Sequence, residues 1–555
     1  MPSALDAQVD AMIEAVTGAG GPVRIGRNAD GRAVVENFPA TLPQFFDIFC
    51  ALNGQVLGLV AGDERLSFAE LNAQATRLAR ALVASWGIAK GDRVAIAMKN
   101  CPAWVIAYMA ALKAGAVATL VNGWWQEAEL AHALALTGPN LVIADPPRAA
   151  RIAAADPAAG IVSLPVDQPL AAALAPLLAD ADHEAVLPEI GPEDDATILF
   201  TSGSTGAAKG AVSSHRAVTT GIYAYAMGLM VLKGIREGRG ETVPAPKTLV
   251  NVPLFHVTGE VPVLLNSFVV GRTMVLMPKW DPGEALRLIE QEGITYFVGV
   301  PTMSLELMQH PDRDKYDLST LSDIAAGGAP RPVAHVTRLQ ESFRHAQPAL
   351  GYGLTETNAV GCSNFWGNYA AKPASTGRAQ APLVEVAILD DGGAALPAEQ
   401  VGEVAIRSAA NVRGYWNDAA ATAAAFTADG WFRTGDLGRL DEDGYLFIVD
   451  RKKDLVIRGG ENISCQEVEA AIYAHPAVSE AAVFGVADER LGEVPAAVIW
   501  SERGIEAQSL REFVAERIAR FKVPEHVWVA AEPLPKLGTG KIDKVSLRAR
   551  YAAAG

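Results

Sequence analysis

The feature of this 555-residue chain that most restricts its fold is the alternation of short apolar segments with helical ones. Ser67 and Glu70 open a helical apolar period as a capping-box pair. The apolar segment 93–98 has the length of a buried strand, 103–114 has a helical pattern, and 117–121 is again strand-like. Because strands that alternate with helices form mostly parallel sheets covered on both faces, we expect an α/β fold.

The rest of the chain divides into further units. A second alternating stretch, 248–350, predicts a second doubly covered sheet, and from Leu383 short strands joined by acidic-glycine turns predict a small β-rich subdomain. A charged run then separates residues 1–452 from a compact final block, 453–555. The charged, glycine- and proline-containing segment 233–247 is expected to be a solvent loop.

Composition narrows the class of partner. The formal net charge is −16 and the pI is about 5.1, which argues against a nucleic-acid partner. The four cysteines are scattered without a C-x-x-C pair, which favours reduced thiols in a cytoplasmic protein. We find neither a basic n-region at the N-terminus nor about 18 uninterrupted apolar residues, so no secretory signal or membrane span is expected. Peripheral membrane association stays open.

The loop at 201–210 is a candidate phosphate site. It contains hydroxyls, glycines and one lysine, Lys209, and follows an apolar run. Glycines let backbone N–H groups approach a phosphate, and a lysine adds a mobile positive charge. The spacing is not that of the common P-loop, because Lys209 follows Ala208 and precedes Gly210. A different phosphate-binding loop and a merely flexible connection both fit this segment alone.

Further segments strengthen the first interpretation when they are read together with this loop. They are, in chain order, Gly351-Tyr352-Gly353-Leu354-Thr355-Glu356-Thr357, Trp431-Phe432-Arg433-Thr434-Gly435-Asp436, Arg451-Lys452-Lys453-Asp454, Gly459-Gly460-Glu461-Asn462-Ile463 and Pro535-Lys536-Leu537-Gly538-Thr539-Gly540-Lys541. Over nearly the whole chain this set resembles the adenylate-forming superfamily of acyl-CoA synthetases, adenylation domains and luciferases. It looks most like the fatty-acid and aryl-acid CoA ligases. The resemblance implies a large N-terminal domain, a small mobile α+β C-terminal domain, and the use of ATP, Mg²⁺ and coenzyme A.

The resemblance also implies roles for individual residues. Lys541 matches the family's catalytic lysine, which contacts the substrate carboxylate and the α-phosphate, and Thr355 would contact the same phosphate. Glu356 matches the acid associated with Mg²⁺, a cation that prefers oxygen ligands. The other ATP-site positions implied by the family are Thr201, Ser202, Gly203, Ser204, Thr205, Gly206, Lys209, Gly328, Ala329, Tyr352, Asp436 and Arg451.

The acid and CoA sites follow from the same resemblance. His256 would line the acid-pocket entrance as a gate or polar contact, with a structural histidine that caps a helix as the alternative. Rotation about a hinge at Lys453 would withdraw Lys541 and bring the CoA-tunnel residues Gly459, Gly460 and Glu461 to the acyl-adenylate. The pocket walls would include Gly299, Val300, Gly327, Gly353, Thr357 and Asn358. These small or apolar walls suit an apolar acyl tail or an aryl group.

The expected function is an ATP-dependent carboxylic acid–CoA ligase. The acid and ATP would give acyl-AMP and pyrophosphate, and CoA would then give acyl-CoA and AMP. A medium- or long-chain fatty acid or an aryl or phenylpropenoic acid is the expected substrate. One alternative is an acyl-AMP ligase that loads a separate carrier protein; another is a non-catalytic nucleotide-binding module. The oligomeric state stays open between monomer and homodimer.

One departure from the family pattern introduces a cysteine. Cys465 stands where a proline often follows the Glu-Asn-Ile-x segment. It could be a reactive thiol near the CoA tunnel, but a buried inert cysteine is the favoured interpretation.

Overall fold

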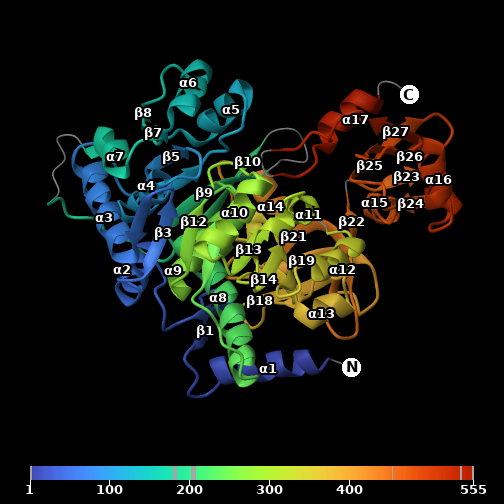
Figure 1. The fold of residues 1–555 in the computed structure, drawn as a ribbon. Helices are drawn as coiled ribbons and strands as arrows, with labels where there is room; N and C mark the ends of the chain where they lie inside the picture. The colour runs from blue at the N-terminus through green and yellow to red at the C-terminus, as the bar shows by residue number, and fades with distance from the viewer. Residues whose placement is uncertain are drawn as a thin grey trace.

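The structure is a computed structural model that describes residues 3–178, 184–201, 208–329, 331–452, 454–459, 461–537 and 540–552. Two large sheets, a small sheet and a separate C-terminal unit make up the chain, as Figure 1 shows. The expected α/β class, with a β-rich subdomain and a small α+β C-terminal part, is therefore confirmed.

The first sheet has seven strands in the order β20-β10-β9-β6-β5-β7-β8. All neighbours from β9 to β8 run parallel, while β10 and β20 add an antiparallel edge. Its strands are β5 (Arg93–Ala97), β6 (Val117–Leu120), β7 (Leu141–Ala144), β8 (Ile161–Ser163), β9 (Asp195–Thr201), β10 (Lys209–Ser214) and β20 (Gly414–Tyr415). The helices that alternate with them are α3 (Phe68–Ala84), α4 (Pro102–Lys113), α5 (Glu127–Thr137), α6 (Pro146–Ala155) and α7 (Leu170–Leu178).

Local sequence signals explain these elements. The side chain of Ser67 accepts from the backbone of Glu70 and the reciprocal bond forms as well, so the predicted capping box opens α3. Residues 103–113 of α4 are all buried, because this helix lies between the sheet and α3. A helix that is apolar all round is typical of a core position.

The second sheet has nine strands in the order β17-β16-β15-β14-β13-β11-β12-β3-β4. They are β3 (Leu57–Ala61), β4 (Glu64–Ser67), β11 (Lys247–Val250), β12 (Thr273–Leu276), β13 (Tyr296–Gly299), β14 (Asp323–Ala326), β15 (Gln347–Gly353), β16 (Gly361–Phe365) and β17 (Arg378–Ala379). Its helices include α2 (Leu42–Leu52), α8 (His215–Gly238), α9 (Asn266–Val270), α10 (Pro282–Glu292), α11 (Pro301–Gln309), α12 (Val333–Ser342) and α13 (Trp366–Ala371), with a π-helical turn, Gly259–Leu265, before α9.

The expectation of a solvent loop over 233–247 is wrong in its first part. Helix α8 continues to Gly238, so only 239–246 connects it to β11. Ile235 on this extension, and Val231 just before it, are buried against Leu5 and Met12 of the N-terminal helix α1 (Ala4–Thr17). This packing stabilises helical turns that the charges alone did not indicate.

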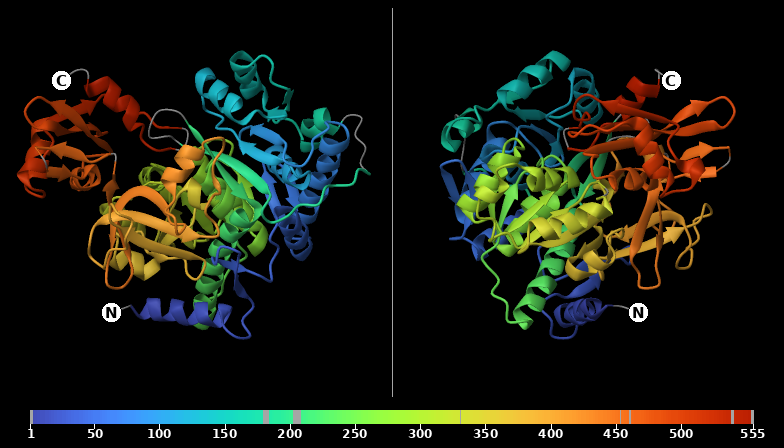
Figure 2. Two further views of the ribbon diagram at one scale, coloured as in Figure 1. Left: turned by 180° about the vertical axis from the view of Figure 1, so that it is seen from behind. Right: turned by 45° about the vertical axis from the view of Figure 1, so that its right-hand side comes forward.

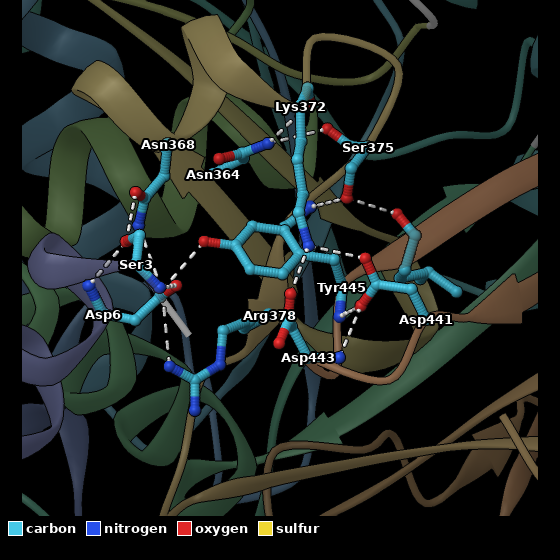
Figure 3. A network of polar contacts seen from close by, with 12 residues as sticks. Ser3, Asp6, Asn364, Asn368, Lys372, Ser375, Arg378, Asp441, Asp443 and Tyr445 are labelled. Atoms are coloured by element: carbon cyan, nitrogen blue, oxygen red, sulfur yellow. Dashed lines mark hydrogen bonds and ion pairs between the residues drawn. The ribbon is translucent and has the colours of Figure 1, made fainter. Parts of the chain in front are cut away.

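Helix α1 is also fixed by a buried polar network, drawn in Figure 3. Asp6 accepts hydrogen bonds from the hydroxyl of Tyr445 at 2.8 Å and the amide of Asn368 at 3.0 Å. Nearby, Lys372 forms ion pairs with Asp441 and Asp443 at 2.6 and 3.0 Å. The acidic turn at 441–444 is therefore structural, as the sequence predicted for such turns.

The β-rich subdomain and the C-terminal unit complete the fold. The four-stranded sheet contains β18 (Val384–Leu389), β19 (Gly402–Ser408), β21 (Phe432–Leu440) and β22 (Leu446–Arg451), with α14 (Ala419–Ala425) nearby. The C-terminal sheet contains β23 (Val456–Arg458), β24 (Glu461–Ile463), β25 (Glu480–Asp488), β26 (Gly492–Trp500) and β27 (His526–Ala530), accompanied by α15 (Cys465–Tyr473), α16 (Ala507–Ala515) and α17 (Lys544–Ala552). Figure 2 shows this unit, in red, at one side of the larger body.

Among the described residues, one helix has the length and hydropathy of a membrane-crossing segment. It is α8, and 61% of its most apolar window is buried inside the protein. Core helices commonly have this character, so the finding is weak evidence for a membrane span.

Candidate active site

Lys541 reaches the large domain from a turn between β27 and α17. The backbone N–H of Leu537 donates to the Lys541 carbonyl at 2.7 Å, and Lys536 pairs with Ile542 in an isolated bridge. The Oγ1 of Thr302, on α11, donates to the Gly540 carbonyl at 3.3 Å. This turn therefore docks against the large domain next to the lysine.

The surroundings of Lys541 come from three distant parts of the chain. A Cβ built on Gly328 would lie 3.8 Å from Lys541 Nζ. Burial, together with the positive charge of Arg451, lowers the pKa of Lys541 to about 8, while Asp436 acts in the opposite direction. A lysine held among these groups is a cation aimed into the cavity that lies between the C-terminal unit and the larger body.

Asp436 and Arg451 lie opposite each other on β21 and β22. Arg451 Nε is 3.0 Å from Asp436 Oδ1, and the hydroxyl of Tyr352 donates to Oδ2 at 2.6 Å. Burial and the neighbouring carboxylate raise the pKa of Tyr352 well above its usual value, so the phenol stays protonated as a donor. The structure brings these three predicted ATP-site residues together in one cluster that lines the cavity.

Glu356 is linked to the phosphate-loop lysine through a tyrosine. The hydroxyl of Tyr415 donates to Glu356 Oε1 at 2.8 Å, and Lys209 Nζ lies 4.9 Å from the centre of the Tyr415 ring. Burial raises the pKa of Glu356 despite the Tyr415 hydrogen bond. Tyr415 was not among the residues that the motifs singled out, because its role depends on β20 pairing with β10.

The phosphate loop is described only at its two ends. Thr201 and Lys209 are register partners on β9 and β10, so the loop closes a hairpin. The expected ligands Ser202, Gly203, Ser204, Thr205 and Gly206 lie outside the described residues. Their phosphate-binding role stays a prediction.

A magnesium ion fits the chemistry of Glu356. Its carboxylate is an oxygen donor, and Thr355 beside it also lines the cavity. Among the described residues, no group of three or more histidine, cysteine, aspartate or glutamate side chains could hold a metal by itself. An ion at Glu356 would therefore take further oxygens from water and phosphate, as Mg²⁺ commonly does.

The acid side of the cavity lies beyond Lys541. His256 lines it, and its Nδ1 accepts from the Thr258 backbone at 3.3 Å, which leaves Nε2 as the protonated nitrogen. Burial, with the nearby charge of Lys541, lowers the pKa of His256 to about 3, so the ring is neutral at physiological pH. The cavity has a volume of about 2930 Å³.

Three of the six predicted pocket walls line this cavity. They are Val300, Gly327 and Gly353, and the predicted ATP-site residues Gly328 and Ala329 line it as well. Close packing explains two of the glycines. A Cβ on Gly353 would lie 2.1 Å from the Ala359 carbonyl oxygen, and one on Gly299 would lie 3.0 Å from Met303 Sδ.

The other three predicted pocket residues do not line the cavity, and one of them is Gly299 at the end of β13. Thr357 and Asn358 are buried and do not line the cavity. Thr357 Oγ1 donates to the Val360 carbonyl at 2.6 Å, while Asn358 Nδ2 donates to the Ala410 carbonyl at 2.7 Å. Their side chains support the backbone behind the pocket.

The expected CoA-tunnel segment is turned away from the cavity. Gly459, with φ at +59°, follows β23, and Glu461 begins β24; both are exposed. Gly460 and the expected hinge, Lys453, lie outside the described residues. Cys465 is buried, and burial raises the pKa of its thiol, which agrees with an inert cysteine.

A further contact at the cleft escaped the motif analysis. Lys536 Nζ lies 2.8 Å from Glu306 Oε1 on α11 and 2.9 Å from Glu480 Oε1 on β25. One lysine therefore joins the large domain, the C-terminal sheet and the turn that carries Lys541. No local signal in the sequence marks Glu306 as its partner.

Comparison with known proteins agrees with this architecture. Residues 49–416 match the AMP-binding enzyme family, and residues 467–541 match the AMP-binding enzyme C-terminal domain. The chain therefore belongs to the AMP-binding enzyme family. The class of enzyme predicted from the motifs, an AMP-forming acid–thiol ligase, is confirmed.

Individual relatives cover nearly the whole chain. The long-chain-fatty-acid–CoA ligase FadD13 of Mycobacterium tuberculosis is 35% identical over 88% of this chain and 94% of its own length. The feruloyl-CoA synthase of an Amycolatopsis species is 35% identical over 88% of this chain and 95% of its own length. The ATP-bound structure of MatB from Rhodopseudomonas palustris covers 93% of this chain and 99% of its own, with a TM-score of 0.81 and 29% identity.

Proposed function

We propose that this protein is an ATP-dependent carboxylic acid–CoA ligase that works through an acyl-adenylate. The observation that carries the proposal is the position of Lys541. It lies beside Gly328, and the charges of Arg451 and Asp436 shift its pKa. Its own charge contributes to the lowered pKa of His256 on the acid side of the cavity. The Lys541 ammonium group thus lies between the predicted ATP-site residues and the predicted acid pocket.

The charges in the first half-reaction require such a cation. A carboxylate and the α-phosphate are both negative, so their approach needs positive charge at the point where the new bond forms. Lys541 supplies that charge, and Arg451 adds to it from β22. Asp436, held by Tyr352, is placed to accept from ribose hydroxyls.

Pyrophosphate, the leaving group of the first half-reaction, would lie at the end of the site next to the 201–210 loop. Lys209 and Glu356 are connected through Tyr415, at the mouth of the 201–210 loop. Pyrophosphate would be held there by Lys209 and the loop, while Mg²⁺ bound through Glu356 would neutralise phosphate charge.

The second half-reaction requires a different arrangement of the C-terminal unit. Coenzyme A would attack the acyl-adenylate, releasing AMP and giving the thioester. Gly459 and Glu461 would have to turn inward for this step, since they are exposed and away from the cavity. Rotation at Lys453 would exchange them for Lys541.

The substrate of the proposed reaction is an acid with a largely apolar body. Phe255, Val298, Val300 and Met303 line the acid side. The relatives named for long-chain fatty acids and for ferulate agree with either a fatty or an aryl acid.

The four cysteines are unpaired, which suits a reducing compartment such as the cytoplasm. Analytical ultracentrifugation would distinguish a monomer from a homodimer.

A screen of carboxylic acids by AMP release tests the proposal. Purified protein with ATP and Mg²⁺ should release AMP and form a thioester only when both an acid and CoA are present. Thioester formation on a carrier protein but not on free CoA would replace the proposal with the carrier-loading alternative. Absence of acid-stimulated pyrophosphate exchange across fatty and aryl acids would favour a non-catalytic nucleotide-binding module.

A further inference from the structure

A buried arginine lies on the wall of the acid cavity, and no carboxylate among the described residues forms an ion pair with it. Arg272, which follows α9, is 2% exposed and lines the cavity. Burial lowers its pKa to about 10, so the guanidinium is still charged at neutral pH. Among the described residues, no ion pair joins it to an acidic side chain, and a buried charge without a partner is costly.

Neutral groups account for part of its hydrogen-bonding capacity. Nε donates to Ser267 Oγ at 2.9 Å, and Nη2 donates to the carbonyls of Pro262 and Val263 at 2.8 and 3.1 Å. Nη1 has no hydrogen bond among the described residues. The guanidinium also lies over the Tyr296 ring, 5.0 Å from its centre. Arg272 is thus held in place with one donor nitrogen left over.

The position of Tyr296 locates this arginine within the cavity. On β13, Tyr296 and Val298 line the cavity, whereas Phe297 between them packs into the core on the other face. Gly299 ends the strand next to Val300, which contacts the Lys541 turn at Gly540. Gly299 is three positions along the strand from Tyr296, a rise of about 10 Å, so Arg272 lies about that far from the reactive end of the pocket.

Helix α8 forms the opposite wall along this length. Tyr225, Leu229, Leu232 and Arg236, which share one helix face, all line the cavity. The pocket therefore has an apolar middle and a cationic far end.

The second arginine at that end differs from the first. Arg236 is 3.0 Å from Asp323, and Asp323 is the register partner of Tyr296 on the next strand. Asp323 also accepts from the indole of Trp366 at 3.0 Å. Arg236 is therefore balanced by a carboxylate inside the protein, whereas Arg272 has no such partner in the part of the chain that the structure describes.

We propose that Arg272 is a specificity-determining residue that binds an oxygen acceptor at the far end of the acid substrate, with a second carboxylate as its best ligand. The proposal rests on the ligase function above and makes its substrate more specific. An apolar body of about 10 Å would fill the middle of the pocket. A terminal carboxylate would accept from Nη1 and supply the missing negative charge, and a terminal carbonyl would accept without supplying charge.

A purely structural role makes a different prediction. The carbonyls of Pro262 and Val263 belong to the π-helical turn, and Arg272 satisfies them. If that were its whole role, substitution would lower stability and reduce activity on all acids equally. Selectivity at the far end would not change.

Matched acids separate the two roles. Full-length enzyme is assayed by AMP release with CoA, using straight-chain monocarboxylic acids, α,ω-dicarboxylic acids and acids with a terminal keto group, all of equal carbon number. The wild type should prefer an oxygen-terminated acid over its methyl-terminated counterpart by about tenfold or more in kcat/KM. Arg272→Met should remove or invert this preference. Arg236→Met, the matched control at the same end, should retain it.

Each result then has one meaning. A wild-type preference for methyl-terminated acids, or an Arg272→Met variant with unchanged selectivity, overturns the proposal. If Arg272→Met fails to fold, Arg272→Lys should keep the sign of the preference at a reduced ratio, and an unchanged ratio counts against it. Comparison of the dicarboxylic acids with the terminal keto acids shows whether Arg272 recognises a negative charge or a neutral hydrogen-bond acceptor.

A binding measurement keeps this inference separate from the proposed function. Thermal stabilisation of wild type, but not of Arg272→Met, by a dicarboxylic acid supports the site even if no thioester forms. In that case only the ligase assignment fails. Thioester formation with dicarboxylic acids that bind both proteins equally leaves the ligase intact and overturns the role of Arg272.

Discussion

Lys541 and Gly328 lie in van der Waals reach of each other although they are far apart in the chain. A Cβ on Gly328 would be 3.5 Å from Cε and 3.8 Å from Nζ of Lys541. Gly328 has φ at +76°, a conformation that glycine adopts without strain. Under the proposed function, this is the arrangement of the C-terminal unit in which Lys541 would serve adenylate formation.

Replacing this lysine should separate the two half-reactions. Lys541→Ala is expected to lower acid-dependent pyrophosphate exchange by at least about 100-fold, because a preorganised charge at the forming bond is lost. Thioester formation from supplied acyl-AMP and CoA should stay within about threefold of wild type. Equal losses of activity in both half-reactions would contradict the hypothesis that Lys541 leaves the site before CoA attacks.

The pH dependence of adenylate formation should follow the same residue. Since the pKa of Lys541 in the free enzyme is lowered to about 8, the lysine loses its proton, and kcat/KM should fall, as pH rises through about 8. Lys541→Arg should show a lower maximum but no such fall, because the guanidinium stays charged. A descending limb unchanged in Lys541→Arg would assign it to another group.

The ion pair between Lys536 and Glu306 should favour the adenylating arrangement. Both side chains are partly exposed, so the pair contributes about 1 kcal/mol or less. Glu306→Gln, which retains an acceptor for the Trp280 indole, should slow adenylate formation by up to about fivefold. Thioester formation from supplied acyl-AMP should not slow. A decrease confined to the second step would exclude this role.

Glu260 should make stability depend on pH. Burial raises the pKa of this carboxyl, which accepts from the Tyr108 hydroxyl at 2.7 Å, to about 7. Because the pKa of an acid is raised on folding, its contribution is fully present below the unfolded pKa, and stability is lost as pH rises through about 7. The loss amounts to about 3 kcal/mol.

Glu260→Gln cannot ionise and should lose less stability between pH 5 and about pH 8 than wild type does. Denaturant unfolding at several pH values measures the difference. Parallel pH profiles for the two proteins would contradict the prediction, because they would show that the pKa of Glu260 is the same in the folded and unfolded states.

The Asp6 network should stabilise the docking of α1 against α13 and the turn before β22 (Figure 3). Burial opposes ionisation, but hydrogen bonds from Ser3 and Tyr445 hold the pKa of Asp6 below its usual value. Asp6→Ala should cost about 2 kcal/mol in the free energy of unfolding. The wild-type advantage should disappear as pH falls, since protonation removes it. Adenylate formation at saturating substrate is the control and should be unchanged.

The sequence predicted much of the fold because its signals are local. The capping pair Ser67 and Glu70 formed as expected, and the apolar run at 93–98 became β5. Short-range periodicity and capping depend on residues a few positions apart, so no tertiary information was needed. The extension of α8 past residue 233 was missed, because the helix there is stabilised by packing against α1.

The candidate site was predictable only in part, for a related reason. Motifs identified Lys541, Glu356 and Asp436, since their residue types are tied to a chemistry that the family resemblance supplies. Tyr415 could not be singled out, because its bond to Glu356 requires β20 to lie beside β10. Thr357 lies in a matching motif, yet its hydroxyl bonds to the backbone behind the pocket.

The sequence by itself therefore determined the α/β class and the family, and it predicted which residues carry the reactive side chains. The tertiary structure decided that Lys541 lies against Gly328 and that Lys536 ties the C-terminal turn to Glu306. It also placed Arg272 on the pocket wall, where no carboxylate of the described ranges pairs with it. The physical reason is distance along the chain. Secondary structure follows from interactions between neighbours, whereas the balance of a buried charge depends on which distant strands and helices pack around it.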